Sequence, residues 1–187
     1  KKNEKKWRTT VDREVKAVRN AVGICDVSNI GKIDIQGKDA LSFINKIYCN
    51  GFAKLPVGKV RYGLMLREDG LVMDDGTTAR MSENHFIMTT TTVNAESVYR
   101  HLEFCHQCLW PELDVQLIST TDAWAQIAIA GPNSRKIISK IIDPEYDVSN
   151  EKFPFMACAD ITICKGVRAR LFRISFSGEL AYELSVP

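Results

Sequence analysis

The sequence lacks the features that mark several large protein classes. No apolar run approaches the roughly 20 residues of a membrane-spanning helix, and no apolar signal core follows the charged first residues. Lys and Arg number 25 against 23 Asp and Glu, so the net charge of +2 predicts no nucleic-acid partner. At 45% hydrophobic residues, the composition is that of a globular protein rather than a disordered or collagen-like one.

Several sequence motifs of common enzyme classes are also missing. There is no G-x-G-x-x-G and no G-x-x-x-x-G-K-[ST], so the chain itself predicts neither a dinucleotide site nor a P-loop. Nothing resembles a nucleophile elbow, a Ser-His-Asp set or a histidine-rich metal cluster.

Six cysteines are present, and without a signal peptide we expect reduced thiols and a cytoplasmic protein. Cys105 and Cys108 form a C-x-x-C pair near two histidines, but a structural zinc site needs a second pair of ligands. Cys158 and Cys164 are too far apart to supply one. On a helix, Cys105 instead lies in line with three apolar residues, Val98, Leu102 and Leu109, as in an ordinary buried stripe. We therefore expect no metal.

Hydrophobic periodicity predicts helices interleaved with antiparallel hairpins, which is an α+β fold with antiparallel sheets and flanking helices. We expect helices from Thr10 to Gly23, from Asp39, after Asn94 and after Gly131. The expected strands cover residues 31–36, 60–66, 71–81, 86–92, 113–119, 124–130, a hairpin over 160–175, and a last strand from 181.

The two ends suggest how this fold is bounded. The chain begins without Met and stops at Pro187 inside a predicted strand, so we expect a truncated piece of a longer polypeptide. Residues 1–9 are predicted to be a linker, and residues 10–187 one domain that is incomplete at its C-terminus.

The predicted strand over 71–81 contains an acidic pair. Alternation places Asp75 on a face with residues 71, 73, 77, 79 and 81, and Asp74 with the more polar residues 72, 76, 78 and 80. A carboxylate among apolar side chains needs hydrogen-bond donors or a cationic ligand. Asp75 is therefore a candidate functional residue, and the alternative is a turn aspartate bonded to backbone amides.

Two further side chains have alternative interpretations. Tyr62 shares a strand face with apolar residues, which suits a core position but also a ring that stacks on a flat ligand. Glu183 lies opposite Tyr182 and Leu184, so alternation alone predicts a solvent-facing residue.

Three segments of the sequence resemble a known protein family. Arg61–Gly76, Val18–Gly31 and Arg173–Leu184 are similar to the folate-binding domain of the aminomethyltransferase (glycine-cleavage T-protein) family. Phe104 with Cys108–Val115, Asn150–Met156 and Leu171–Leu180 resemble one branch in particular, the C-terminal half of the alpha subunit of heterotetrameric sarcosine oxidase. The similarity covers essentially everything after Trp7.

The resemblance implies a tetrahydrofolate site. Asp75 matches the catalytic carboxylate that faces the reactive amines of tetrahydrofolate in that family. Glu183 matches the glutamate that holds the pterin edge. Tyr62 matches a tyrosine that packs on the ring, and Thr77 lies on the face of Asp75. The implied set of cofactor-binding residues is Tyr62, Asp75, Thr77, Thr91, Phe176 and Glu183.

Some positions depart from the family. Phe176 stands where many relatives have Tyr, and Thr91 where the stand-alone transferases have Asn. Met156 and Ala157 replace an aromatic pair seen in some members. We therefore expect a pterin pocket whose side walls differ from those of the stand-alone enzyme.

The resemblance implies a function for the parent enzyme, in which sarcosine is oxidised at a flavin and tetrahydrofolate captures the one-carbon unit as 5,10-methylenetetrahydrofolate. FAD, FMN and NAD would bind in other parts of the complex, with beta, gamma and delta subunits as partners. The fragment alone is expected to be inactive. Alternatives are a stand-alone aminomethyltransferase, a dimethylglycine dehydrogenase-like domain, and a non-catalytic folate-binding regulatory protein.

Overall fold

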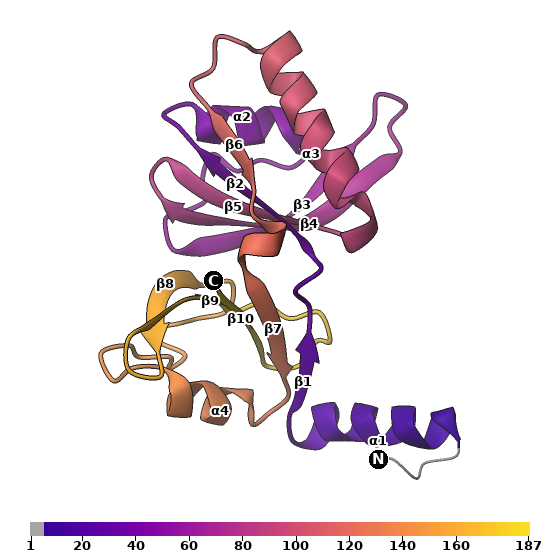
Figure 1. Ribbon diagram of the computed structural model, residues 1–187, viewed down its shortest axis with the longest axis vertical. Helices are drawn as coiled ribbons and strands as arrows, with labels where there is room; N and C mark the ends of the chain where they lie inside the picture. The colour runs from indigo at the N-terminus through magenta and orange to yellow at the C-terminus, as the bar shows by residue number, and fades with distance from the viewer. Residues whose placement is uncertain (1–5) are drawn as a thin grey trace. The chain divides into compact units, whose positions relative to one another are not determined.

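The computed structural model describes residues 6–187, which form two compact units. Unit 1 contains the described residues through Val27 together with Gln126–Phe155 and Asp160–Pro187. Unit 2 contains Ser28–Ala125 and Met156–Ala159. Each unit combines one five-stranded sheet with helices (Figure 1), which confirms the predicted α+β class.

Unit 2 is built on an antiparallel sheet with the order β3-β4-β5-β2-β6. Its strands are β2 (Gly31–Gln36), β3 (Lys59–Leu66), β4 (Val72–Ser82), β5 (His85–Thr90) and β6 (Gln116–Ser119). Its helices are α2 (Ala40–Ile47) and α3 (Ala95–Phe104), with short helical turns at Thr92–Asn94, Cys105–Leu109 and Thr121–Ala123.

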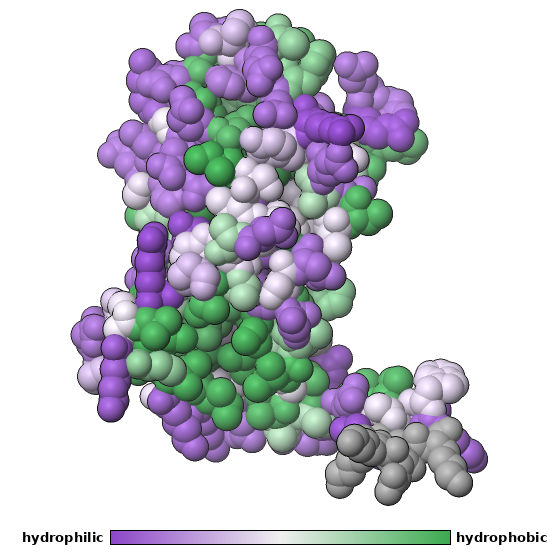
Figure 2. Space-filling view, viewed as in Figure 1, coloured by the Kyte–Doolittle hydropathy of each residue, from purple (hydrophilic) through white to green (hydrophobic). Residues whose placement is uncertain are grey.

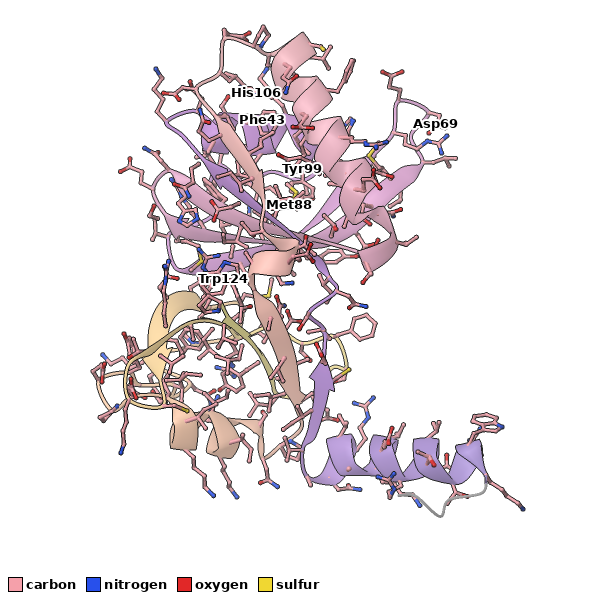
Figure 3. All side chains as sticks on the ribbon, viewed as in Figure 1. Phe43, Asp69, Met88, Tyr99, His106 and Trp124 are labelled. Atoms are coloured by element: carbon pink, nitrogen blue, oxygen red, sulfur yellow. The ribbon has the colours of Figure 1, made fainter. Side chains whose placement is uncertain are left out.

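The core of unit 2 lies between α2, α3 and one face of this sheet. Phe43 of α2 and Met88 of β5 are completely buried, and Tyr99 of α3 packs against the same cluster (Figure 3). Phe43 also meets the rings of His106 and Trp110 edge to face, with centroids 6.1 and 6.0 Å away. Burial of this apolar face is the main term that holds the helices on the sheet.

Unit 1 contains the second sheet, with the order β1-β7-β10-β9-β8, except for the first residue of β7 and the first two of β8, which are counted with unit 2. Its strands are β1 (Gly23–Asp26), β7 (Ala125–Ala130), β8 (Cys158–Ile163), β9 (Val167–Phe172) and β10 (Ala181–Val186). Its helices are α1 (Trp7–Asn20) and α4 (Ser134–Ile141). Figure 2 shows apolar surface on this unit beside the hydrophilic outer side of α4.

Helix α1 is amphipathic but contributes no buried residue to unit 1. Three of its large apolar side chains, Trp7, Val11 and Val15, are exposed. Among residues 6–187, no helix has both the length and the apolar character that a membrane span requires.

The first helix and strand differ from the sequence prediction. Helix α1 begins at Trp7 rather than Thr10, so residues 7–9 of the predicted linker are helical, while residues 1–5 lie outside the described residues. The helix ends at Asn20, and Gly23 starts β1, which was not predicted. A Cβ at Gly23 would lie 2.5 Å from the Val18 side chain, so glycine permits this tight return of the chain.

The predicted stripe along α3 is correct for three residues and wrong for the fourth. Val98, Leu102 and Cys105 are buried, whereas Leu109 is 52% exposed. The helix widens into a π-helical turn at Cys105–Leu109, where the Trp110 amide donates to the Cys105 carbonyl. The wider turn breaks the regular helical spacing and rotates Leu109 away from the core.

The predicted hairpin in unit 1 is confirmed as β8 and β9, joined by a turn with three left-handed residues. Cys164, Lys165 and Gly166 have φ values of 50°, 70° and 101°. The Asp143 carboxylate accepts hydrogen bonds from the Lys165 and Gly166 amides, both at 2.8 Å. Hydrogen bonds from Thr162 and from these two amides hold the pKa of Asp143 below its usual value.

We predict that Asp143→Asn lowers the melting temperature of the protein by a few degrees at neutral pH. Because the folded-state pKa of Asp143 is depressed, its contribution is present above the unfolded pKa of about 3.9 and is lost as the pH falls through the folded pKa. Thermal melts of both proteins from pH 7 to pH 3 would measure this. The gap should narrow progressively as the pH falls below about 4, and a constant gap would contradict the assignment.

Candidate functional site

The paired strands β3 and β4 bring three of the predicted site residues to one face of the sheet. Tyr62 pairs with Thr77, and Leu64 pairs with Asp75, so Tyr62, Thr77 and Asp75 point the same way. Residues directly opposite in an antiparallel pair share a face, and Asp75 and Thr77 are two residues apart on β4. The structure therefore places these three side chains together, as the strand pattern predicted for Asp75 and Thr77.

Tyr62 and Asp75 are joined directly. The Tyr62 hydroxyl donates a short hydrogen bond to the Asp75 carboxylate. Tyr62 is 51% exposed, and Asp75 is half-buried. This hydrogen bond is the main cause of a raised pKa for Tyr62, because losing the phenol proton would destroy it and leave two negative charges in contact.

Asp74 lies on the opposite face of β4 and has a structural role. Its carboxylate is 4% exposed and accepts hydrogen bonds from the Thr91 amide at 3.1 Å and the Thr91 hydroxyl at 2.7 Å. The Asn94 side-chain amide donates a third bond at 3.0 Å. These donors come from the segment between β5 and α3, so Asp74 joins β4 to the start of α3.

The environments of the two aspartates are the reverse of what alternation suggested. Asp75 was expected on the more apolar face, but Asp74 is the buried one, and its cross-strand partner Met65 is only 2% exposed. The face of Asp74 is the one covered by α2 and α3. Hydrogen-bond donors from Thr91 and Asn94 make this burial possible.

Thr91 and Thr77 both have hydrogen-bond partners within unit 2. The Thr91 hydroxyl bonds to Asp74 rather than Asp75. The Thr77 hydroxyl lies 3.0 Å from the Thr89 hydroxyl, and the Thr77 amide donates to the same oxygen at 3.0 Å. Asn94, expected as a helix cap, makes no capping bond with its side chain and binds Asp74 and the Met73 carbonyl instead.

Two glycines permit close approaches beside Asp75. Gly63 and Gly76 are cross-strand partners. A Cβ at Gly63 would lie 2.6 Å from the Tyr48 ring, and one at Gly76 would lie 2.0 Å from the Thr89 carbonyl oxygen. The Tyr48 hydroxyl, buried beneath, lies 3.0 Å from the Thr78 hydroxyl. The strand that carries Asp75 therefore tolerates no side chain at position 76 without moving β5.

Glu183 and Phe176 belong to unit 1. Glu183 on β10 is half-buried and accepts a short hydrogen bond from the Gln126 side-chain amide of β7. The Ser185 hydroxyl donates to the Gln126 side-chain oxygen Oε1 at 3.2 Å. Phe176 is fully exposed in the loop between β9 and β10, which Arg19 holds by bonds to the Ser177 carbonyl and the Glu179 carboxylate.

The sequence did not predict that Gln126 bonds to Glu183 or that Ser185 bonds to Gln126. Gln126 is the only polar residue in the otherwise apolar run Ala125–Ala130. A single polar side chain in an apolar strand is a signal that it hydrogen-bonds inside the protein. Its partner could not be named from the sequence, because Gln126 and Glu183 are separated by 57 residues.

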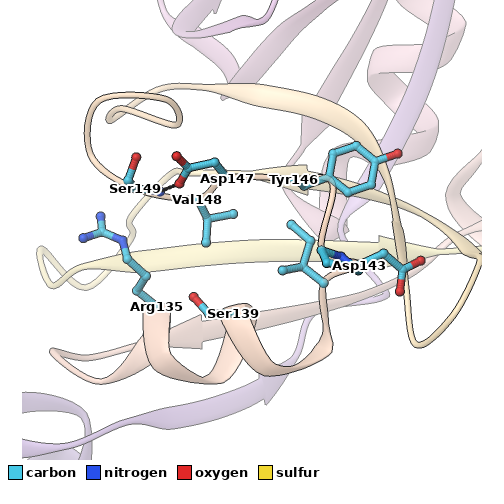
Figure 4. Close-up of a pocket in the computed structure, with 9 residues that line it drawn as sticks. Arg135, Ser139, Asp143, Tyr146, Asp147, Val148 and Ser149 are labelled. Carbon is cyan, nitrogen blue, oxygen red and sulfur yellow. Dashed lines mark hydrogen bonds between the residues drawn. The ribbon is translucent and has the colours of Figure 1, made fainter.

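A hollow of about 520 Å³ opens in unit 1 between α4 and the loop that follows it (Figure 4). Arg135, Asp143, Tyr146 and Asp147 are among its lining residues, and none of the predicted site residues lines it. Arg135 donates to the Tyr182 hydroxyl at 2.9 Å and to the Asn150 side-chain oxygen Oδ1 at 2.6 Å, so its guanidinium is already hydrogen-bonded within the protein.

The cysteines contribute no cluster of metal ligands. Within residues 6–187, no group of three or more His, Cys, Asp or Glu side chains is arranged to hold a metal ion. Cys105 is buried, which raises the pKa of its thiol, and the His101 ring lies against its sulfur at 3.5 Å.

The chain matches a known protein family along almost its whole length. The sequence pattern of the GCVT N-terminal domain matches residues 2–187, which is nearly the whole chain. The chain belongs to the GCVT N-terminal domain family. This confirms the resemblance to the aminomethyltransferases noted from the sequence.

Relatives in the GCVT family include sarcosine oxidase alpha subunits and aminomethyltransferases. The sarcosine oxidase subunit alpha of Rhizobium meliloti (strain 1021) is 60% identical over 185 residues, which is 98% of this chain but 18% of that protein. The aminomethyltransferase of Geobacillus sp. (strain WCH70) is 33% identical over 94% of this chain and 46% of its own length. The chain thus spans about a fifth of the first group and about half of the second.

Solved structures show the same fold. The glycine cleavage system aminomethyltransferase T from Bartonella henselae matches with a TM-score of 0.78 at 21% identity, over 94% of this chain and 44% of that one. A chain of the heterotetrameric sarcosine oxidase from Corynebacterium sp. U-96 matches with a TM-score of 0.65 at 12% identity, over 94% of this chain and 83% of that one.

We predict that Gly76→Ala destabilises the protein by about 1–3 kcal/mol, the usual cost of overpacking a closely packed site. The added Cβ would meet the Thr89 carbonyl oxygen at 2.0 Å. Urea unfolding would measure the loss, with Gly51→Ala as the control because a Cβ there meets nothing within 4 Å. Equal losses in the two variants would show that the close approach at Gly76 is unimportant.

We further predict that Asp75→Asn lowers the pKa of the Tyr62 phenol toward its ordinary value of about 10. The carboxylate that stabilises the phenol proton would be gone, while the size of the side chain stays the same. Absorbance at the tyrosinate band, followed against pH, would report the titration, and Tyr62→Phe would identify which transition belongs to Tyr62. An unchanged Tyr62 transition in Asp75→Asn would contradict the bond.

Proposed function

We propose that this chain is the tetrahydrofolate-binding part of a sarcosine oxidase alpha subunit. In this role it captures the one-carbon unit released from oxidised sarcosine and forms 5,10-methylenetetrahydrofolate. The identity of 60% to an alpha subunit, against 33% to an aminomethyltransferase, supports this choice of branch. The observation that carries the chemistry is the half-buried Asp75 carboxylate, held by Tyr62 on the opposite face from the structural Asp74.

The chemistry of the candidate residues fits a reduced pterin. A pterin presents N–H donors along its edge and two amines at its reactive end, and a carboxylate suits either kind of donor. Unit 2 offers Asp75, and unit 1 offers Glu183. The Tyr62 hydroxyl donates to Asp75, and the Gln126 side-chain amide donates to Glu183. Carboxylate oxygens have further acceptor capacity, and two parallel N–H bonds to one carboxylate fix orientation as well as charge.

Bound tetrahydrofolate supplies the two amines that take up a one-carbon unit at the oxidation level of formaldehyde, with loss of one water. Asp75 would accept an N–H bond from the reactive amine and orient it toward the incoming carbon. Its negative charge would stabilise the positive charge that develops as water leaves. Tyr62 would hold the carboxylate in one rotamer, so that this stabilisation needs little rearrangement.

The proposal extends to the larger protein. The remaining length of the alpha subunit would carry the flavin and nicotinamide chemistry, with FAD, FMN and NAD bound outside this chain. The beta, gamma and delta subunits would be its partners. By this proposal, the chain on its own would lack the activity of the whole enzyme.

A stand-alone aminomethyltransferase is the second candidate, because such enzymes are also similar along almost the whole chain. Thr91 would discriminate between the two candidates, because it stands where the stand-alone transferases have Asn. In this chain its hydroxyl donates to Asp74. The two candidates differ in the source of the one-carbon unit, so release of hydrogen peroxide with sarcosine as substrate would separate them.

We predict that Asp75→Asn in the assembled enzyme leaves sarcosine oxidation within about twofold of wild type but reduces methylenetetrahydrofolate formation about 10²–10³-fold, as for loss of one charge-stabilising group. The one-carbon unit would then appear as free formaldehyde. Hydrogen peroxide, formaldehyde and methylenetetrahydrofolate would be measured in the same reaction.

The matched control for this experiment is Glu68→Gln, which neutralises an exposed carboxylate on the β3–β4 turn. It should leave both oxidation and capture unchanged. Capture that persists at the wild-type rate in Asp75→Asn would mean that Asp75 does not take part. A parallel fall in oxidation would indicate a general structural defect instead.

A further inference from the structure

Two buried polar side chains lie beside Glu183 in unit 1. Gln126 of β7 is 2% exposed, and Ser185 of β10 is 3% exposed. Glu183 and Ser185 are two residues apart on β10, so they share a face of the strand. Gln126 reaches both of them from the neighbouring strand β7.

The Glu183 carboxylate determines the direction of the hydrogen bonds that join Ser185, Gln126 and Glu183. The Ser185 hydroxyl donates to the carbonyl oxygen of the Gln126 amide at 3.2 Å. The nitrogen of the same amide then faces Glu183 and donates to its carboxylate. A rotated amide would place its oxygen against the carboxylate, which accepts hydrogen bonds but cannot donate when ionised. The carboxylate therefore fixes which end of Gln126 it meets, and the Ser185 hydroxyl holds the amide in that orientation by donating to its oxygen.

We propose that Gln126 and Ser185 are positioning residues, which hold the Glu183 carboxylate ready for a ligand that offers two parallel N–H donors, as the amino-pyrimidine edge of a pterin does. This inference rests on the proposed function, because it takes Glu183 as the residue that meets the ligand. The two residues act through Glu183 and touch no reacting atom.

The benefit of this arrangement comes from order in the free protein. A glutamate side chain has three rotatable bonds, and a ligand that has to immobilise it loses affinity. In this chain the Gln126 bond already restricts the carboxylate at one oxygen. That oxygen has a second lone pair, so the bond from Gln126 does not prevent it from accepting a ligand N–H as well.

The sharpest test is Gln126→Glu, which preserves shape but replaces the donor with a second carboxylate. Two carboxylates in contact share a proton, so the variant must take up or hold a proton before Glu183 can be positioned. Tetrahydrofolate should therefore bind the complete variant protein about ten- to a hundredfold more weakly than wild type at pH 8. The difference should shrink toward pH 5.5.

Isothermal titration with tetrahydrofolate, run in buffers of different ionisation enthalpy, would count the protons taken up on binding. The variant should take up more protons than wild type. A purely structural defect would weaken binding at every pH without this added uptake. Gln116→Glu on the exposed edge of β6 adds the same charge on a strand in unit 2 and should bind as wild type does.

Ser185→Ala provides an independent variant in case Gln126→Glu does not fold. Without the Ser185 hydroxyl the buried Gln126 side-chain oxygen loses this hydrogen bond and the amide is held less firmly, so we expect about tenfold weaker binding at all pH values. Wild-type protein that fails to bind tetrahydrofolate would overturn the proposed function. Wild-type protein that binds, while both variants bind equally well with the same pH profile, would overturn this inference alone.

Discussion

The candidate site in unit 2 depends on the hydrogen bonds that the buried Asp74 carboxylate accepts. Three donors from Thr91 and Asn94 surround it, and each is contributed by the segment that enters α3. Hydrogen bonds to a buried charge are strong, and removal of a partner leaves an expensive unpaired group. Because Asp74 is fixed on the covered face of β4, the next residue along the strand must point the other way. The position of Asp75 is thus a consequence of the hydrogen bonds made by Asp74.

Neighbouring identical residues acquire different properties through the pleat of one strand. Asp74 is satisfied by protein donors, whereas Asp75 has one neutral donor, Tyr62, and remains half-buried. Gly63 and Gly76 are needed for the same arrangement, because they leave room for the Tyr48 ring beside β3 and for the Thr89 backbone beside β4. In unit 1 the pattern recurs, since Glu183 is held by the neutral amide of Gln126. In both places a neutral donor helps to orient the carboxylate.

Local pattern predicted some of this arrangement and could not predict the rest. Alternation with period two placed Asp75 with Thr77, and the hairpin signals placed β3 and β4 side by side. Which face of β4 is covered depends on α2 and α3, which pack through contacts distant in sequence, so the burial of Asp74 and Asp75 was predicted the wrong way round. Strand β1, with four residues at a sheet edge, gave too short a pattern to find. The π-helical turn after α3 changed the spacing that had placed Leu109 in the core.

The proposed role of Asp75 is tested most directly by a structure of the protein with a stable analogue of tetrahydrofolate bound. We expect an Asp75 carboxylate oxygen within about 3.2 Å of one of the two amine nitrogens that carry the one-carbon unit. The Tyr62 hydroxyl should still donate to that carboxylate, and Asp74 should keep its bonds to Thr91 and Asn94. A bound analogue whose reactive amines lie away from Asp75, or a ligand held by Asp74, would contradict this role.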